Sequence, residues 1–109
     1  MVDDDDATRE AVTELLKMLG HRCEAASTGR QAFDIILRRN FDVLITDVNL
    51  PGMSGVEMAR NIVERCPRIR VIFSSGHVVP LEEAPDFSWR QLPKPYTLEQ
   101  LENALRVEN

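Results

Sequence analysis

The chain has 109 residues, with 13 lysines and arginines against 18 aspartates and glutamates and a net charge of −5. This length predicts one domain, residues 1–109, and a hydrophobic content of 43% predicts a globular chain rather than a disordered one. The acidic balance argues against direct nucleic-acid binding by this domain. The sequence has no apolar run long enough for a membrane span and no secretion signal, which predicts a cytoplasmic protein.

Apolar residues at helical spacing alternate along the chain with short apolar runs typical of buried strands. The expected elements, in chain order, are a helix over 5–20, a weak strand over 21–26, a helix over 28–40, a strand over 41–46, a helix over 54–66, a strand over 69–73, an irregular segment or short helix over 77–88, a strand over 90–92 and a helix over 97–105. Capping-box spacing, which satisfies backbone N–H groups of the first turn, marks three of the helix starts. These pairs are Thr28 with Gln31, Ser54 with Glu57 and Thr97 with Gln100.

Alternating helices and strands predict an α/β domain whose parallel sheet is covered by helices on both faces. In such sheets ligands bind outside the carboxyl ends of the strands. Asp47, Ser75 and Lys94 each follow a predicted strand. Asp3 and Asp4 would end a first strand, so we expect all five side chains at one edge of the sheet.

Three carboxylates, a hydroxyl and an ammonium group in one place suit a divalent cation and a phosphoryl group. Mg²⁺ prefers oxygen ligands, and clustered carboxylates repel one another in ways that favour cation binding. One carboxylate can then act as a nucleophile toward phosphorus, while a lysine and a hydroxyl hold the transferred oxygens.

Four segments resemble, in order and spacing, the response regulator receiver domains of two-component signalling. They are VDDD at residues 2–5, DVNLPGMSG at 47–55, VIFSSG at 71–76 and LPKPY at 92–96. The resemblance covers essentially the whole chain. It implies a flavodoxin-like, doubly wound fold with five parallel strands in the order 2-1-3-4-5.

The resemblance also implies a phosphoacceptor switch, in which Asp47 receives the phosphoryl group. Its Mg²⁺ would be held directly by Asp4, by Asp47 and by the backbone carbonyl of Asn49, and by Asp3 through water. Its partner would be a sensor histidine kinase or a histidine phosphotransfer protein. The domain would catalyse only its own phosphorylation and dephosphorylation, and would not be an enzyme acting on other substrates.

Further roles follow from the same resemblance. Lys94 would pair with the phosphoryl group, and Ser75 would turn inward to donate a hydrogen bond to it. The Lys94–Pro95 peptide bond is cis in the family. Asn49 and His77 occupy positions that flank the phosphoryl group in relatives and tune its lifetime.

Gln91 stands where relatives usually carry an aromatic residue that moves with the switch, so we expect a different coupling between Ser75 and the surface. The prolines of the 77–88 segment and the short spacing from Ser75 to Lys94 predict a short or irregular fourth helix. In relatives this helix and the last strand often form a dimer face.

Only Met1 and Val2 precede the acidic pair, whereas a strand normally has about five residues. We therefore expect a truncated first strand, a misplaced start, or strand exchange between chains in a dimer. A missing central strand predicts low stability, because its neighbours lose ladder partners and apolar cover.

Two other functions are compatible with the acidic cluster. A Mg²⁺-dependent aspartyl phosphohydrolase would also use a strand-end aspartate, but such enzymes usually place a second acid where this chain has Asn49, which cannot protonate a leaving group. A pseudo-receiver would act as an interaction module without phosphorylation, and failure to bind Mg²⁺ would favour it.

Overall fold

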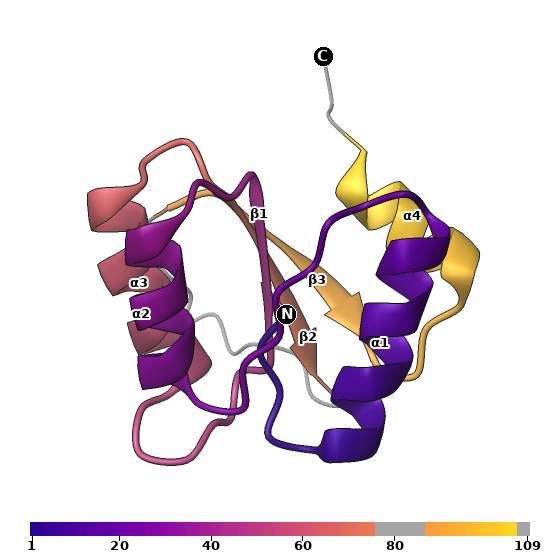
Figure 1. The fold of residues 1–109 in the computed structure, drawn as a ribbon, viewed down its shortest axis with the longest axis horizontal. Coiled ribbons are helices and arrows are strands. Elements are labelled where there is room, and N and C mark those ends of the chain that lie inside the picture. The colour runs from indigo at the N-terminus through magenta and orange to yellow at the C-terminus, as the bar shows by residue number, and fades with distance from the viewer. Residues whose placement is uncertain (76–86, 107–109) are drawn as a thin grey trace.

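In a computed structural model that describes residues 1–75 and 87–106, the chain forms a parallel sheet between two pairs of helices (Figure 1). The helices α2 and α3 cover one face of the sheet, and α1 and α4 cover the other. The described elements are α1 (Asp6–Met18), α2 (Gly29–Arg38), β1 (Val43–Thr46), α3 (Gly55–Arg65), β2 (Arg70–Ser75), β3 (Trp89–Pro93) and α4 (Leu98–Leu105).

Each of these four helices begins after an N-cap side chain that accepts a hydrogen bond from a backbone N–H of the first turn. The N-caps are Asp5, Thr28, Ser54 and Thr97. The predicted capping box is complete at Thr97, where Gln100 returns a hydrogen bond to the Thr97 backbone. At Thr28 the Gln31 side chain instead accepts from the backbone and hydroxyl of Ser27.

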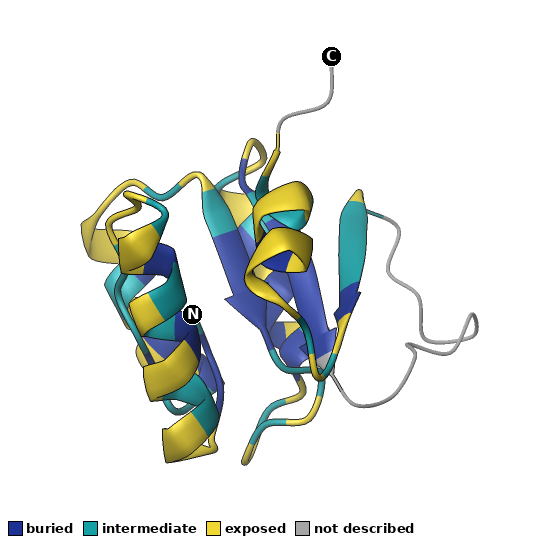
Figure 2. Cartoon of the chain, turned by 90° about the vertical axis from the view of Figure 1, so that its right-hand side faces the viewer, coloured by how far each residue is buried: buried dark blue, intermediate teal, exposed yellow. Residues whose placement is uncertain are grey.

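The three strands pair in the order β1-β2-β3, all parallel. Leu44 and Val71 face α2 and α3, whereas their neighbours Ile45 and Ile72 face α1 and α4. Successive strand residues point to opposite faces, so a strand covered on both sides must be apolar throughout. Figure 2 shows buried residues on the strands and on the inner sides of the helices, with exposed residues outside.

Val2 occupies the position of the expected first strand. It forms isolated parallel bridges with Ala26 on one side and Thr46 on the other. The lateral order is therefore Ala26, Val2, β1, β2 and β3, which agrees with the expected 2-1-3-4-5 arrangement.

The predicted strand over 21–26 is wrong, and the described residues form three strands rather than five. Ala26 alone pairs, because a ladder needs a partner of equal length and only Val2 with its neighbours lies beside this segment. The expected first strand is short: of its residues, Val2 alone forms strand-type bridges. The predicted irregular fourth-helix segment, with Pro80 and Pro85, falls largely within residues 76–86, outside the described residues.

No helix in the described ranges is long and apolar enough to cross a membrane.

Val2 is 2% exposed and packs in the core between the sheet and α2. We expect Val2→Ala to lower the free energy of unfolding by about 2 kcal/mol, because it removes buried methyl groups from the residue that joins Ala26 to β1. Urea denaturation followed by circular dichroism measures this loss.

Met18→Ala is the matched control, because Met18 is 71% exposed and its truncation should change stability by less than about 0.5 kcal/mol. Equal effects of the two substitutions would show that the Val2 bridges contribute nothing to stability.

Candidate functional site

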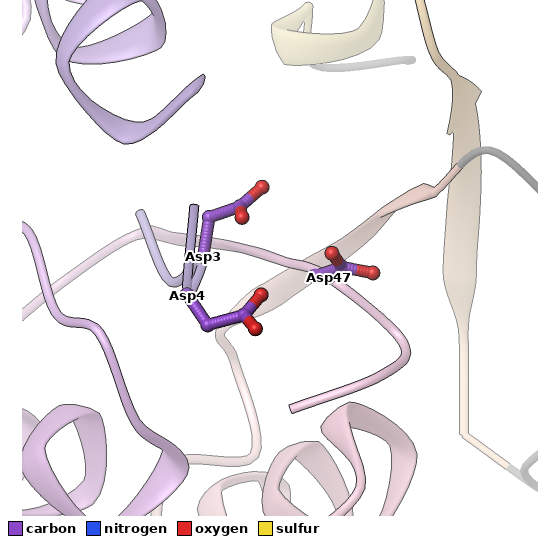
Figure 3. Close-up of side chains that lie close together, drawn as sticks. All are labelled: Asp3, Asp4 and Asp47. Carbon is purple, nitrogen blue, oxygen red and sulfur yellow. The ribbon is translucent and has the colours of Figure 1, made fainter. Parts of the chain in front are cut away.

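Three aspartates converge at the carboxyl edge of the sheet. Asp3 and Asp4 directly follow Val2, and Asp47 directly follows β1. One carboxylate oxygen from each lies within 4.8 Å of the others. Figure 3 shows Asp3 and Asp4 on the N-terminal segment with Asp47 beside them. Asp3 is buried, Asp47 partly buried and Asp4 exposed, so the cluster opens to solvent on the Asp4 side.

Backbone hydrogen bonds around Val2 place two of these aspartates. The Asp47 N–H donates to the Val2 carbonyl over 2.9 Å, and the Asp3 N–H donates to the Ala26 carbonyl over 3.1 Å. The carboxylates are thus carried on paired backbone rather than on loose loops.

Lys94, which follows β3, reaches into the cluster. Its Nζ lies 2.6 Å from Asp3 Oδ2 and 3.3 Å from Asp47 Oδ2. Burial acts to lower the pKa of Lys94, but its hydrogen bond to Asp3 and the charge of Asp47 outweigh burial and raise the pKa above the ordinary value. Lys94 is therefore a fixed cation at neutral pH. The Lys94–Pro95 peptide bond is cis, as expected.

Backbone N–H groups complete the surroundings of the two inner carboxylates. The Asp5 N–H donates to Asp3 Oδ1 over 2.9 Å, and the Asn49 N–H donates to Asp47 Oδ1 over 3.2 Å. Among the described residues, no hydrogen bond or ion pair engages the exposed Asp4 carboxylate. One oxygen-rich side of the cluster is thus left open.

The structure brings four of the five expected side chains together: Asp3, Asp4, Asp47 and Lys94. Ser75 is described by its backbone, as the last residue of β2 with Pro93 as its Cα partner. This register places Ser75 beside the residue that precedes Lys94. His77 lies outside the described residues.

Gly55, at the start of α3, positions the Asp47 backbone. The sequence alone did not show why a glycine is needed there. Its N–H donates to the Val48 carbonyl over 2.7 Å, and a Cβ at this position would lie 1.8 Å from the Asp47 carbonyl oxygen. Only glycine lets the helix approach the Asp47 backbone this closely. The sequence did carry one indication of this close approach: a glycine stands directly after the Ser54 cap, where alanine is the better helix former.

Two aromatic residues at opposite ends of β3 have distinct environments, since Trp89 begins the strand and Tyr96 follows Lys94 after it. Trp89 packs edge-on against Phe73, with ring centroids 5.4 Å apart. The Tyr96 hydroxyl is buried, and burial raises its pKa although the nearby Ser74 hydroxyl and the Lys94 charge oppose the rise. Both hydroxyls, of Ser74 and Tyr96, lack a hydrogen-bond partner within the described ranges.

The donor set fits a hard divalent cation. All of its side-chain ligand atoms are carboxylate oxygens, and three negative charges face one ammonium group. Mg²⁺ takes oxygen ligands and retains several waters, which the open Asp4 side can admit.

Comparison with known proteins identifies relatives over nearly the whole chain. Residues 1–106 match the family described as the response regulator receiver domain. The chain is 31% identical over 113 residues to the response regulator MprA of Mycolicibacterium vanbaalenii, covering 98% of this chain and 48% of MprA. It is 28% identical over 109 residues to the response regulator receiver protein CpdR of Brucella abortus, covering 96% of this chain and 90% of CpdR.

Among solved structures, the chemotaxis protein CheY4 of Vibrio cholerae is similar, with a TM-score of 0.87 and 28% identity. The alignment covers 95% of this chain and 91% of CheY4, and the chain has the α/β CheY-like fold. Other relatives are much longer. The chain spans 22% of the DNA-binding transcriptional regulator NtrC of Klebsiella pneumoniae and 12% of the sensor kinase CckA of Brucella abortus.

We expect Gly55→Ala to lower the free energy of unfolding by about 3 kcal/mol, because the added methyl group collides with the Asp47 backbone rather than with a movable side chain. This collision should also displace Asp47 and thereby weaken Mg²⁺ binding, which isothermal titration calorimetry measures.

Gly29→Ala is the matched control at another helix start, where the added Cβ would meet the flexible Met58 side chain at 3.2 Å. It should stay within about 1 kcal/mol of the parent and keep its Mg²⁺ affinity. If Gly55→Ala behaved like this control, close approach of α3 to Asp47 would not matter.

Proposed function

The chain belongs to the response regulator receiver domain family, and from this membership we propose that it is a phosphoacceptor switch whose Asp47 receives a phosphoryl group. One observation carries the proposal: the Asp47 carboxylate lies within reach of the Lys94 ammonium and of two further carboxylates at the carboxyl edge of a parallel sheet. Receiver domains interact with histidine kinases in two-component systems, so the proposed donor is a sensor histidine kinase or a histidine phosphotransfer protein.

The proposed transfer forms one bond and breaks another. An Asp47 carboxylate oxygen attacks phosphorus in line, the bond from phosphorus to the donor imidazole nitrogen breaks, and the imidazole keeps the electron pair. Asp47 becomes an acyl phosphate, and water later hydrolyses it to regenerate the carboxylate. Such transfers depend mainly on positioning and charge neutralisation.

Each neighbouring group has a proposed part in this transfer. Asp4, Asp47 and the Asn49 carbonyl would hold Mg²⁺ directly and Asp3 through water, and the cation would neutralise charge on the phosphoryl oxygens. Lys94, already 3.3 Å from Asp47 Oδ2, would pair with the same oxygens. Ser75 would donate a hydrogen bond to them from the end of β2.

A switch fits better than a phosphohydrolase. Asn49 is exposed two residues after Asp47, and its amide has no titratable proton to give a leaving group. We propose a cytoplasmic signalling module that contacts neither nucleic acid nor membrane itself.

With acetyl phosphate and MgCl₂, the chain should gain the mass of one phosphoryl group, measured by intact-mass spectrometry, and Asp47→Asn should gain none. Asp34→Asn, an equal charge change at an exposed position of α2, is the matched control and should be phosphorylated normally. A gain of mass in Asp47→Asn, or none in the parent, would refute the proposed acceptor. Sustained turnover of phosphomonoesters would instead favour a phosphohydrolase.

Lys94→Met should change two properties in opposite directions. Mg²⁺ should bind about fivefold more tightly, a gain of roughly 1 kcal/mol in binding free energy, because the substitution removes a positive charge that competes for Asp3 and Asp47. Phosphorylation by acetyl phosphate should slow by about a hundredfold, because a group that stabilises the transferred oxygens is lost.

Calorimetry measures the affinity, and mass spectrometry over time measures the rate. Lys17→Met, an exposed lysine on α1, is the control and should change neither. Unchanged values for both properties in Lys94→Met would show that Lys94 has no part in the site.

A further inference from the structure

Arg9 of α1 is a charged side chain that has no part in the proposed phosphoryl transfer. Its side chain is 20% exposed, whereas that of Lys17, farther along the same helix, is 60% exposed. Nη1 of Arg9 donates to the backbone carbonyl of Asp3 over 2.9 Å, and Nη2 forms a salt bridge with Asp6. The guanidinium therefore lies against the segment that carries two of the three aspartates of the cluster.

The backbone of this segment turns between its two aspartates. Successive side chains of a regular strand point to opposite sides. Asp4 instead lies in a bend, and Figure 3 shows the carboxylates of Asp3 and Asp4 both extending toward the side where Asp47 lies. One oxygen from each carboxylate lies within 4.8 Å of the others. The peptide that joins Asp3 to Asp4 must be held in this turned orientation for the cluster to form.

Hydrogen bonds hold the backbone on both sides of Asp4. On one side the Asp3 carbonyl accepts from Arg9, and on the other the Asp5 N–H donates to Asp3 Oδ1 over 2.9 Å. A peptide unit is planar, so fixing the Asp3 carbonyl also fixes the direction in which the Asp4 Cα lies. The Asp4 carboxylate has no hydrogen-bond or ion-pair partner of its own in the described part of the chain. Its orientation therefore depends on these two backbone contacts.

Arginine has a property that this contact needs. Its guanidinium is planar and presents its N–H donors in fixed directions. Asp6 is 82% exposed, so its salt bridge contributes little to stability, but it fixes the plane of the guanidinium and aims Nη1 at the Asp3 carbonyl. A lysine ammonium has no such plane and cannot hold a carbonyl and a carboxylate in one fixed geometry.

The charge of Arg9 acts against a cation site. Lys94 already places one positive charge in the cluster, and a second one nearby repels a divalent cation. If Arg9 acted through its charge alone, its removal would tighten Mg²⁺ binding. If Arg9 acts by holding the Asp3 carbonyl, its removal weakens Mg²⁺ binding. The two effects have opposite signs, so one affinity measurement separates them.

We propose that Arg9 is a positioning residue of the cation site. It fixes the peptide between Asp3 and Asp4, so that the Asp4 carboxylate faces the open side of the cluster before a cation arrives. The proposal rests on the proposed function in one respect, that the cluster binds Mg²⁺. Arg9 itself contacts neither the cation nor the phosphoryl group. Its contribution is preorganisation, which reduces the ordering cost of binding and leaves the transfer step at saturating cation unchanged.

Isothermal titration calorimetry with MgCl₂ tests the sign of the effect. Arg9→Met keeps a long apolar stem but loses the guanidinium, and it should weaken Mg²⁺ binding about tenfold, the size expected for a lost hydrogen bond from a charged donor. Arg9→Lys keeps the charge but loses the planar fork, and it should bind Mg²⁺ at least about threefold more weakly than the parent. Lys17→Met removes a positive charge elsewhere on the same helix; it is the matched control and should keep the parent affinity.

Two further measurements separate positioning from a purely structural role. With acetyl phosphate, Arg9→Met should need about tenfold more MgCl₂ for half-maximal phosphorylation, while its rate at saturating MgCl₂ stays within about twofold of the parent. Without Mg²⁺, hydrogen exchange followed by mass spectrometry should be faster over residues 3–9 and unchanged over residues 29–38 of α2. Melting curves show whether each variant is folded at the titration temperature. Arg9→Lys keeps a strong helix former and gives the answer where Arg9→Met does not fold.

Equal or tighter Mg²⁺ binding by Arg9→Met would overturn the inference and leave Arg9 an electrostatic role only. Parent affinity in Arg9→Lys would show that the planar guanidinium is not required and would overturn it as well. A fall in the saturated rate with unchanged Mg²⁺ affinity would place Arg9 in the transfer step and overturn positioning. Failure of the parent to bind Mg²⁺ would refute the proposed cation site together with this inference. Failure of phosphorylation with normal Mg²⁺ binding would refute the proposed acceptor function alone.

Discussion

The site depends on the burial of one carboxylate. Asp3 is 0% exposed, and a buried charge is stable only when it is paired and hydrogen-bonded. Its pairing comes from Lys94, 91 residues away in the sequence, at 2.6 Å, and from the Asp5 N–H at 2.9 Å. This requirement fixes the end of β3 against the N-terminal segment, and the same ammonium then reaches Asp47. The ion pair that stabilises Asp3 is thereby the contact that assembles the cluster.

The remaining charge imbalance explains why the cluster can be both stable and reactive. Lys94 contacts Asp3 and Asp47 but leaves two negative charges of the three uncompensated, and the Asp4 carboxylate faces solvent. Solvent screens the exposed carboxylate, so its repulsion costs little in the absence of a cation. The same exposure gives a hydrated cation a route to the oxygens. Parallel strands with their carboxyl ends at one edge create this concentration of charge. The last residue of β2, Ser75, lies at the same edge.

Sequence reasoning predicted the features that are local in the chain or set by periodicity. The Thr97–Gln100 capping box is read within four residues, and the buried runs of β1 and β2 are read from their continuous apolar character. The positions of Asp3, Asp47 and Lys94 at strand ends predicted that they share one edge of the sheet. The resemblance to receiver domains then implied the strand order. The prediction of a strand over 21–26 was wrong because a strand needs a paired neighbour along its length, and here only Val2 pairs with it, at Ala26. The contact of Gly55 with the Asp47 carbonyl could not be read either, since it depends on how closely α3 approaches another segment in space.

The acidic cluster and the sheet share the same short piece of backbone. Val2 bridges Ala26 to β1, and the next residue, Asp3, begins the cluster, with Asp3 held to Ala26 and Asp47 held to Val2 by backbone hydrogen bonds. Asp3 and Asp4 are attached directly to this ladder, so ordering it also orders two of the three carboxylates. Coupling between binding sites is reciprocal: a cation that fixes Asp3 and Asp4 must favour an ordered ladder by the same free energy with which an ordered ladder favours the cation.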